Sequence, residues 1–137
     1  MIEEIDASLG EISKVVAYLE QTLPPHTILF LRGDLAAGKT TLTQAIAKAR
    51  GVEGEVTSPT FSLQHCYGEA LYHYDLYRLS HEAFMEMGLF EEFDKVGWHL
   101  IEWGSDELKA FLLAVGYRVA VVSIEPQGTG RRYEVEV

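Results

Sequence analysis

Hydrophobic positions at helical spacing begin near the start of the chain. Ser8 followed by Glu11 is typical of a capping box, the pairing that opens many helices. Apolar residues then recur at the helical period until Pro24 ends the segment; they are Ile12, Val15, Val16, Leu19 and Leu23. The pattern predicts an amphipathic helix over residues 8–23.

The next two segments predict a strand followed by a helix. TILFLRG, residues 27–33, is a short apolar run that ends at a glycine, which is typical of a strand buried on both faces. Residues 39–50 contain neither Gly nor Pro, and Leu42, Ile46 and Ala49 share one apolar stripe that stops before Gly51. A tight connection, residues 33–38, separates the two predicted elements.

The rest of the chain alternates between aromatic-rich strands and short helices. In chain order we predict an exposed loop over 51–60, a hairpin over 60–79, helical turns over 80–87 and 89–96, a buried strand over 98–104, a helix over 105–113 and a hairpin over 117–137. Helices interleaved with apolar strands predict an α/β fold, with a largely parallel sheet edged by antiparallel hairpins.

Composition limits the class of protein. The length, 137 residues, predicts a single domain over 1–137, and no apolar run approaches the roughly 18 residues of a membrane span. The acidic start MIEEIDASLG does not resemble a secretory signal, and Cys66 alone cannot form an internal disulfide, so we expect a cytoplasmic protein. With 11 basic against 21 acidic residues, the net charge of -10 would repel a nucleic-acid backbone; strong direct nucleic-acid binding is not expected.

The connection between the predicted strand and helix, GDLAAGKTT, matches the phosphate-binding loop pattern G-x-x-x-x-G-K-[ST]. Backbone N–H groups of such a loop point inward, and the first helical turn adds positive potential, so a triphosphate is held there. We therefore expect a nucleoside triphosphate with Mg²⁺ to bind at Gly33, Asp34, Leu35, Ala36, Ala37, Gly38, Lys39, Thr40 and Thr41.

Individual residues of this loop have distinct expected roles. Gly33 and Gly38 permit conformations and close approach that a Cβ would block. Lys39 would reach the β and γ phosphates, and the hydroxyl of Thr40 would bind the metal ion. The alternative is a glycine-containing helix entry whose lysine faces solvent.

Three further residues are candidates for catalysis, each with a structural alternative. Glu102 closes the apolar run WHLIE, where a carboxylate would emerge beside the loop, or it is an ordinary acid at a strand end. Asp75 is either functional or the partner of a nearby cation such as Arg78. Thr60, in SPT, is either a γ-phosphate contact that orders its loop or the capped start of a strand.

Four motifs in order, GDLAAGKTTL, TSPTFSL, HYDLYRL and IEWG, resemble the bacterial ATPase family TsaE of tRNA threonylcarbamoyladenosine synthesis. The resemblance runs from about Ile28 to Trp103. It implies a three-layer P-loop NTPase-like fold and an ATPase that acts on a threonylcarbamoyl-transferring enzyme and that enzyme's inactive paralogue, rather than on tRNA itself.

The same resemblance assigns residue roles. It implies that the nucleotide is ATP or ADP and that Trp103 lies beside it. It also implies that Asp75, Glu102 and Thr60 support hydrolysis and that Thr40, Glu102 and Asp75 bind Mg²⁺.

One residue departs from the pattern of the family, which usually has GDLGAGKT. Ala36 stands at the fourth position, and a left-handed alanine would cost roughly 1 to 2 kcal/mol. We therefore predict that Ala36 adopts a negative φ.

Two alternative functions would use the same loop. The first is a small-molecule or nucleotide kinase, for which few residues remain to build an acceptor pocket and a lid. The second is a nucleotide-binding switch that does not hydrolyse the nucleotide.

Overall fold

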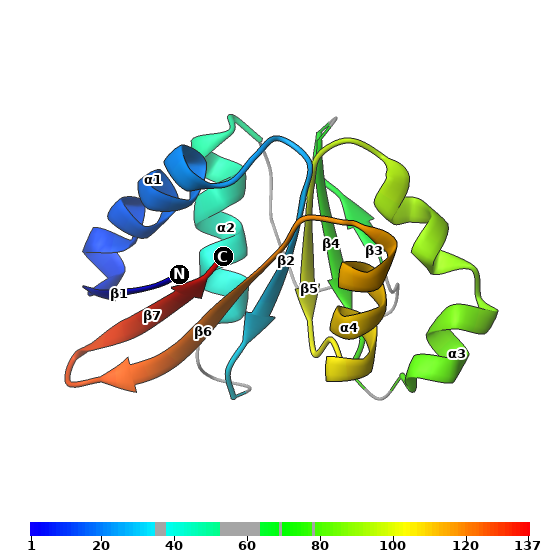
Figure 1. The fold of residues 1–137 in the computed structure, drawn as a ribbon. Helices are drawn as coiled ribbons and strands as arrows, with labels where there is room; N and C mark the ends of the chain where they lie inside the picture. The colour runs from blue at the N-terminus through cyan, green and yellow to red at the C-terminus, as the bar shows by residue number, and fades with distance from the viewer. Residues whose placement is uncertain (35–37, 53–63, 69, 78) are drawn as a thin grey trace.

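A seven-stranded sheet forms the centre of the computed structural model, which describes residues 1–34, 38–52, 64–68, 70–77 and 79–137 (Figure 1). The strands follow the spatial order β1-β7-β6-β2-β5-β4-β3. Their bounds are β1 Ile2–Ala7, β2 Thr27–Arg32, β3 Gln64–Cys66, β4 Leu71–Asp75, β5 Trp98–Glu102, β6 Val119–Gln127 and β7 Gly130–Glu136.

The central four strands, β6, β2, β5 and β4, are parallel to one another. The outer strands add antiparallel pairs: β3 on β4, β7 on β6 and β1 on β7. The predicted α/β class, a parallel sheet with antiparallel hairpins at its edges, is therefore confirmed. The described part of the predicted hairpin over 60–79 is β3 and β4, whereas most of the predicted loop over 51–60 lies outside the described residues.

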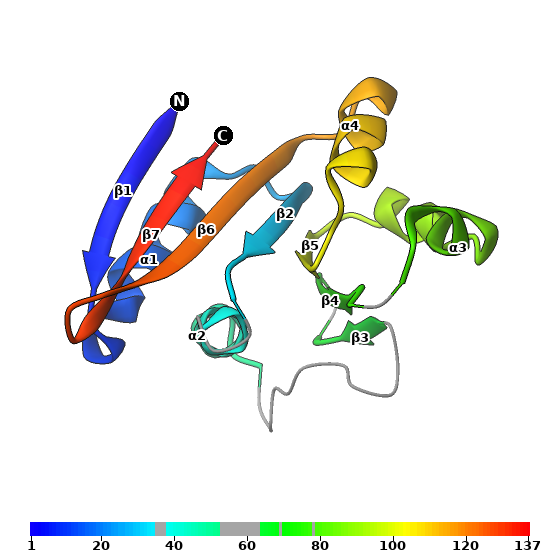
Figure 2. The same cartoon turned by 90° about the horizontal axis from the view of Figure 1, so that it is seen from below.

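Helices cover both faces of the sheet, which gives three layers (Figures 1 and 2). The first pair, α1 Ile12–Thr22 and α2 Lys39–Ala49, packs on one face, and the second, α3 His81–Glu86 and α4 Asp106–Val115, on the other. Two 3-10 helices, η1 Leu9–Glu11 and η2 Leu89–Asp94, complete the elements. No helix in the described ranges has the length and apolar character that crossing a bilayer requires.

The sheet separates two hydrophobic cores. Alternate residues of β2 point to opposite sides: Leu29 and Leu31 pack with α1 and α2, and Ile28 and Phe30 pack with α4. All four side chains are at most 1% exposed. The prediction of a strand buried on both faces is therefore confirmed for β2.

Helix boundaries follow the predicted capping residues. Ser8 N donates to Glu11 Oε1 over 3.1 Å, and this hydrogen bond holds the pKa of Glu11 below its usual range. The box opens η1 first, so α1 begins at Ile12 rather than at residue 8. Ser80 and Ser105 cap α3 and α4 by accepting from the N–H three residues on.

Strand β1 is the element that the hydrophobic pattern did not predict. It pairs antiparallel with β7, and the two chain ends lie side by side, with Met1 N donating to Val137 O over 3.2 Å (Figure 2). Only Ala7 of this strand is fully buried. Because β1 is an edge strand with little apolar alternation, its stability depends on a partner at the other end of the sequence.

His99 is a neutral imidazole buried between the sheet and η2. Its Nε2 lies 2.8 Å from Lys95 O, and Tyr74 Oη lies 2.7 Å from its Nδ1. A neutral imidazole protonated at Nε2 satisfies both contacts, donating to the carbonyl and accepting from the phenol. Burial lowers the pKa of His99 from 6.5 to about 4.

This shift predicts that stability falls in acid. Because the folded pKa of His99 is depressed, the unfolded chain takes up the proton first, and His99 loses stabilisation as pH falls from about 6.5 to about 4. The full loss is about 3 kcal/mol. Urea unfolding of wild type and His99→Asn checks this: the difference in unfolding free energy should shrink across that window. A difference independent of pH would contradict it.

Candidate functional site

The candidate site lies where the parallel strands end. Leu31, Glu102 and Asp75 are register neighbours across β2, β5 and β4. Side chains paired in register point to the same face, and Leu31 packs with Leu42 of α2. Glu102 and Asp75 therefore stand on the face of the sheet that α2 covers.

The described part of the loop enters α2 through Gly38, whose φ of 108° is a left-handed conformation that favours glycine. Thr40 and Thr41 follow in the first turn and are half-buried. Three loop residues, Leu35, Ala36 and Ala37, lie outside the described residues. The negative φ of Ala36 therefore stays a prediction.

Lys39 does not face solvent. Its side chain turns back onto the loop, and Nζ donates to Gly33 O over 2.6 Å and to Asp34 O over 2.9 Å. The residue is only 4% exposed, and Nζ lies 4.3 Å from the ring centroid of Trp103. The alternative of a solvated lysine is therefore wrong. Two loop carbonyls and the ring of Trp103, the residue after β5, therefore hold the ammonium group of Lys39 in place.

Trp103 takes an unusual backbone conformation to reach this place. Its φ of 62° is left-handed, at a cost of roughly 1 to 2 kcal/mol. Next to it, a Cβ on Gly104 would lie 2.4 Å from the ring of Phe30, so only glycine fits there. The Trp103 ring also contacts that of Tyr77, with centroids 4.9 Å apart. The strained turn places an aromatic ring beside the loop, lining a cavity of about 220 Å³ with Gly33.

Glu102 is a buried carboxylate, 4% exposed, whose Oε2 is hydrogen-bonded to His73 Nε2. The carboxylate can only accept, so His73 donates its Nε2–H. His73 is itself fully buried, and its Nδ1 has no hydrogen-bond partner among the described residues. Glu102 is therefore not an ordinary solvated acid at a strand end, because a buried carboxylate costs free energy unless it is paired.

Sequence reasoning did not predict the pairing of His73 with Glu102. The sequence contained one indication of it: side chains alternate between the two faces of a strand, so His73 and Asp75 of β4 share a face. Asp75 is the register partner of Glu102. Finding the pair required the register, which the sequence does not provide.

The other two catalytic candidates are Asp75 and Thr60. Asp75 is half-buried, and its Oδ1 accepts from Tyr77 N over 2.9 Å, which orders the turn after β4. Thr60 and Arg78 lie outside the described residues, so their predicted roles stay predictions.

The donors at this edge suit a magnesium ion. Mg²⁺ prefers oxygen ligands and takes only one or two from the protein, with phosphate and water supplying the others. The described residues hold no cluster of three or more His, Cys, Asp or Glu side chains arranged for a metal. The hydroxyl of Thr40 and the carboxylates of Asp75 and Glu102 are nevertheless all oxygen donors on the same face of the sheet.

The chain is similar in sequence to one family of known proteins. Residues 7–133 match the family model described as "Threonylcarbamoyl adenosine biosynthesis protein TsaE". Two curated proteins named tRNA threonylcarbamoyladenosine biosynthesis protein TsaE are similar: that of Synechocystis is 51% identical over 45% of this chain, and that of Haemophilus influenzae is 42% identical over 63%. The matched segments span 41% and 60% of those relatives' own lengths.

A solved structure, the crystal structure of Bacillus subtilis YdiB, superposes with a TM-score of 0.64 at 26% sequence identity. The superposition covers 100% of this chain and 88% of that chain. Because the superposition covers the whole chain, the fold similarity includes β1, which the hydrophobic pattern did not predict, as well as β2 and α2 on either side of the phosphate-binding loop.

Proposed function

Because this chain belongs to the TsaE family of threonylcarbamoyl adenosine biosynthesis proteins, we propose that it binds ATP with Mg²⁺ and hydrolyses it in tRNA threonylcarbamoyladenosine synthesis. It would act in the cytoplasm on the threonylcarbamoyl-transferring enzyme and its inactive paralogue, which would hold the tRNA. The net charge of -10 supports this division of roles, because an acidic chain repels the phosphate backbone.

The observation that carries the proposal is the ammonium group of Lys39, buried at the front of α2 on the face that also carries Glu102 and Asp75. An ammonium has three N–H donors, and Gly33 O and Asp34 O accept two of them. The third can donate to a phosphate oxygen. The backbone N–H groups at the start of α2 add the positive end of the helix dipole.

Hydrolysis adds a requirement for a group that orients the attacking water. Glu102 fits this role, since its carboxylate is buried and fixed by His73 and can accept a proton from water at the γ-phosphate end. Thr40 would hold Mg²⁺, with Asp75 and Glu102 in reach directly or through water. When bound, the ion would neutralise charge on the β and γ phosphates. Trp103 would exclude water beside Lys39.

Phosphate release measured with ATP and Mg²⁺ tests the proposal. The purified chain alone should release phosphate slowly, and the chain combined with the transferase and its paralogue should release it severalfold faster than the sum of the separate proteins. The partners alone provide the background rate.

Other results would point to the alternatives. Phosphoryl transfer that requires a small-molecule acceptor would indicate a kinase. ATP binding without phosphate release, with the partners or without, would indicate a switch. If the chain does not bind ATP at all, the proposed function is wrong.

A further inference from the structure

His73 is a buried polar side chain that the phosphate-binding loop pattern does not include. It lies on β4 and pairs in register with Leu100 of β5. Glu102 pairs with Asp75, two residues further along each strand. The hydrogen bond from His73 to Glu102 is therefore diagonal across the two strands, within the reach of long side chains. Asp75 is held separately, since its Oδ1 accepts from Tyr77 N over 2.9 Å.

The imidazole of His73 is held in place by its surroundings. The residue is fully buried, and its ring centroid lies 6.3 Å from that of Tyr67. By the alternation of β4 it shares a face with Leu71, which packs in the core beneath α1 and α2. A side chain whose rotamer is fixed by packing can hold a second side chain in a defined geometry. His73 is therefore suited to fix the direction of the Glu102 carboxylate.

His99 shows how this fold accommodates a structural histidine. Its two ring nitrogens lie within hydrogen-bond distance of Lys95 O and Tyr74 Oη, so both are satisfied inside the core. His73 differs, because its Nδ1 is buried without a hydrogen-bond partner among the described residues. A buried polar atom that lacks a partner costs free energy, which an apolar residue at this position would avoid. The hydrogen bond to Glu102 is the interaction that only a polar residue at position 73 can supply.

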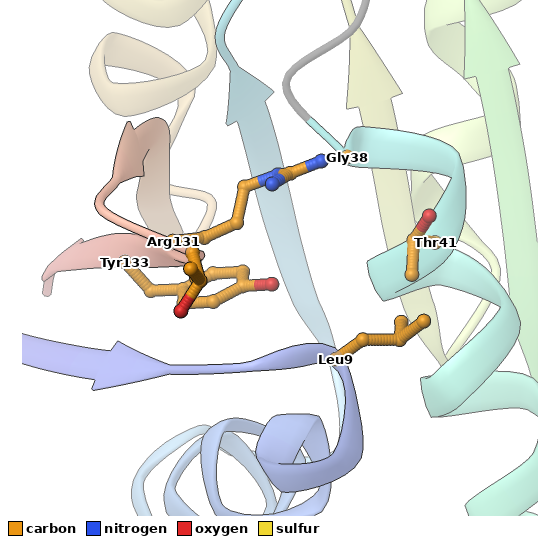
Figure 3. A pocket seen from close by; sticks show the side chains of 7 residues that line it. Leu9, Gly38, Thr41, Arg131 and Tyr133 are labelled. Atoms are coloured by element: carbon orange, nitrogen blue, oxygen red, sulfur yellow. The ribbon is translucent and has the colours of Figure 1, made fainter.

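Two cationic side chains near the loop are directed elsewhere. Lys39 Nζ donates to two carbonyl oxygens of the loop. Arg131 extends from β7 toward Gly38, beside a cavity of about 150 Å³ between α2 and β7 (Figure 3). Strands β6 and β2 separate β7 from β5, which carries Glu102. Within the described ranges, His73 is therefore the donor that holds the Glu102 carboxylate.

We infer that His73 is a positioning residue for hydrolysis. Its Nε2–H holds one oxygen of the Glu102 carboxylate and so directs the other oxygen toward the water or the metal ion. The inference rests on the proposed function, since it assumes that Glu102 acts at the γ-phosphate end of ATP. His73 acts through Glu102 and not on the nucleotide, so its loss lowers turnover and leaves nucleotide binding intact.

Two amide variants test this role. The amide N–H of His73→Gln lies close to the position of the imidazole Nε2–H, whereas the shorter side chain of His73→Asn places it near Nδ1, out of reach of Glu102. With the partner proteins present, His73→Asn should lower phosphate release about 10- to 100-fold, and His73→Gln should stay within about threefold of wild type. Calorimetry should give an ATP affinity within about threefold of wild type for both variants.

His65→Asn is the matched control. His65 is the register partner of His73 on the neighbouring strand β3, and its Nδ1 lies 3.1 Å from Tyr67 Oη. The same substitution at this position removes an imidazole from the same face of the sheet without removing the donor to Glu102. It should therefore change neither phosphate release nor ATP affinity.

A double variant separates positioning from a structural role. If His73 acts only through Glu102, adding His73→Asn to Glu102→Gln should leave turnover within about threefold of Glu102→Gln alone. Losses that multiply would mean that His73 supports the site independently of Glu102, and the inference would be wrong. Thermal unfolding of each variant verifies that the fold is retained.

Nitrogen NMR of histidine-labelled wild type gives a readout that does not depend on activity or on the folding of a variant. It should find a proton on Nε2 of His73, and a proton on Nδ1 alone would overturn the inference. A folded His73→Asn protein with wild-type turnover would overturn it too, while leaving the proposed function intact. Wild type that releases no phosphate with the partner proteins would remove both.

Discussion

Lys39→Ala should lose nucleotide binding. We expect the affinity for ATP with Mg²⁺ to fall more than a hundredfold, because charge-assisted hydrogen bonds contribute about 1.5–3 kcal/mol each and Lys39 would serve both the β and γ phosphates. The buried position of Nζ strengthens this expectation, since solvent screens a buried charge less than an exposed one. Calorimetric titration with ATP measures the effect directly.

Lys48→Ala is the control for this variant. Lys48 lies on the same helix α2 and is exposed, so its loss removes an equal charge without touching the loop. Lys39→Ala also removes the hydrogen bonds to Gly33 O and Asp34 O, and thermal unfolding separates a collapsed loop from an unfolded chain. A folded Lys39→Ala protein that binds ATP within threefold of wild type would contradict the assigned role.

The strand–loop–helix unit could be predicted because its indications are local. The apolar run of β2, the glycine that ends it and the helical stripe of α2 are each read within a dozen residues. The caps Ser80 and Ser105 are equally local, since each accepts from an N–H three residues away. Local geometry of this kind depends little on the rest of the fold.

The missed features all depend on contacts between distant segments. Strand β1 is stabilised by β7, more than 120 residues away, and its own residues alternate too weakly to indicate a strand. The pairing of His73 with Glu102 joins β4 to β5, and the approach of Arg131 to Gly38 joins β7 to α2. The sequence placed an acid at the end of β5 but could not establish that it is buried and paired, because burial depends on how the sheet is assembled.

The buried pairing of Glu102 leads to the second large effect. Glu102→Gln should keep ATP affinity within about threefold of wild type and reduce turnover about 10²- to 10⁴-fold, the range typical for loss of a general base. Glutamine has nearly the same shape and keeps an oxygen that can accept from His73 Nε2–H, so the packing around residue 102 should survive. Calorimetric titration with ATP measures the affinity. Phosphate release in the presence of the partner proteins measures the turnover.

The control, Glu107→Gln, removes an exposed carboxylate from the first turn of α4 and should change neither quantity. The comparison decides what the buried carboxylate does. Binding retained with turnover lost places Glu102 at the reacting water, because an interaction made only in the transition state lowers kcat without altering ground-state affinity. Equal loss of binding and turnover would instead mean that Glu102 acts only by holding the nucleotide and its metal ion, and the water would need another base on the same face of the sheet.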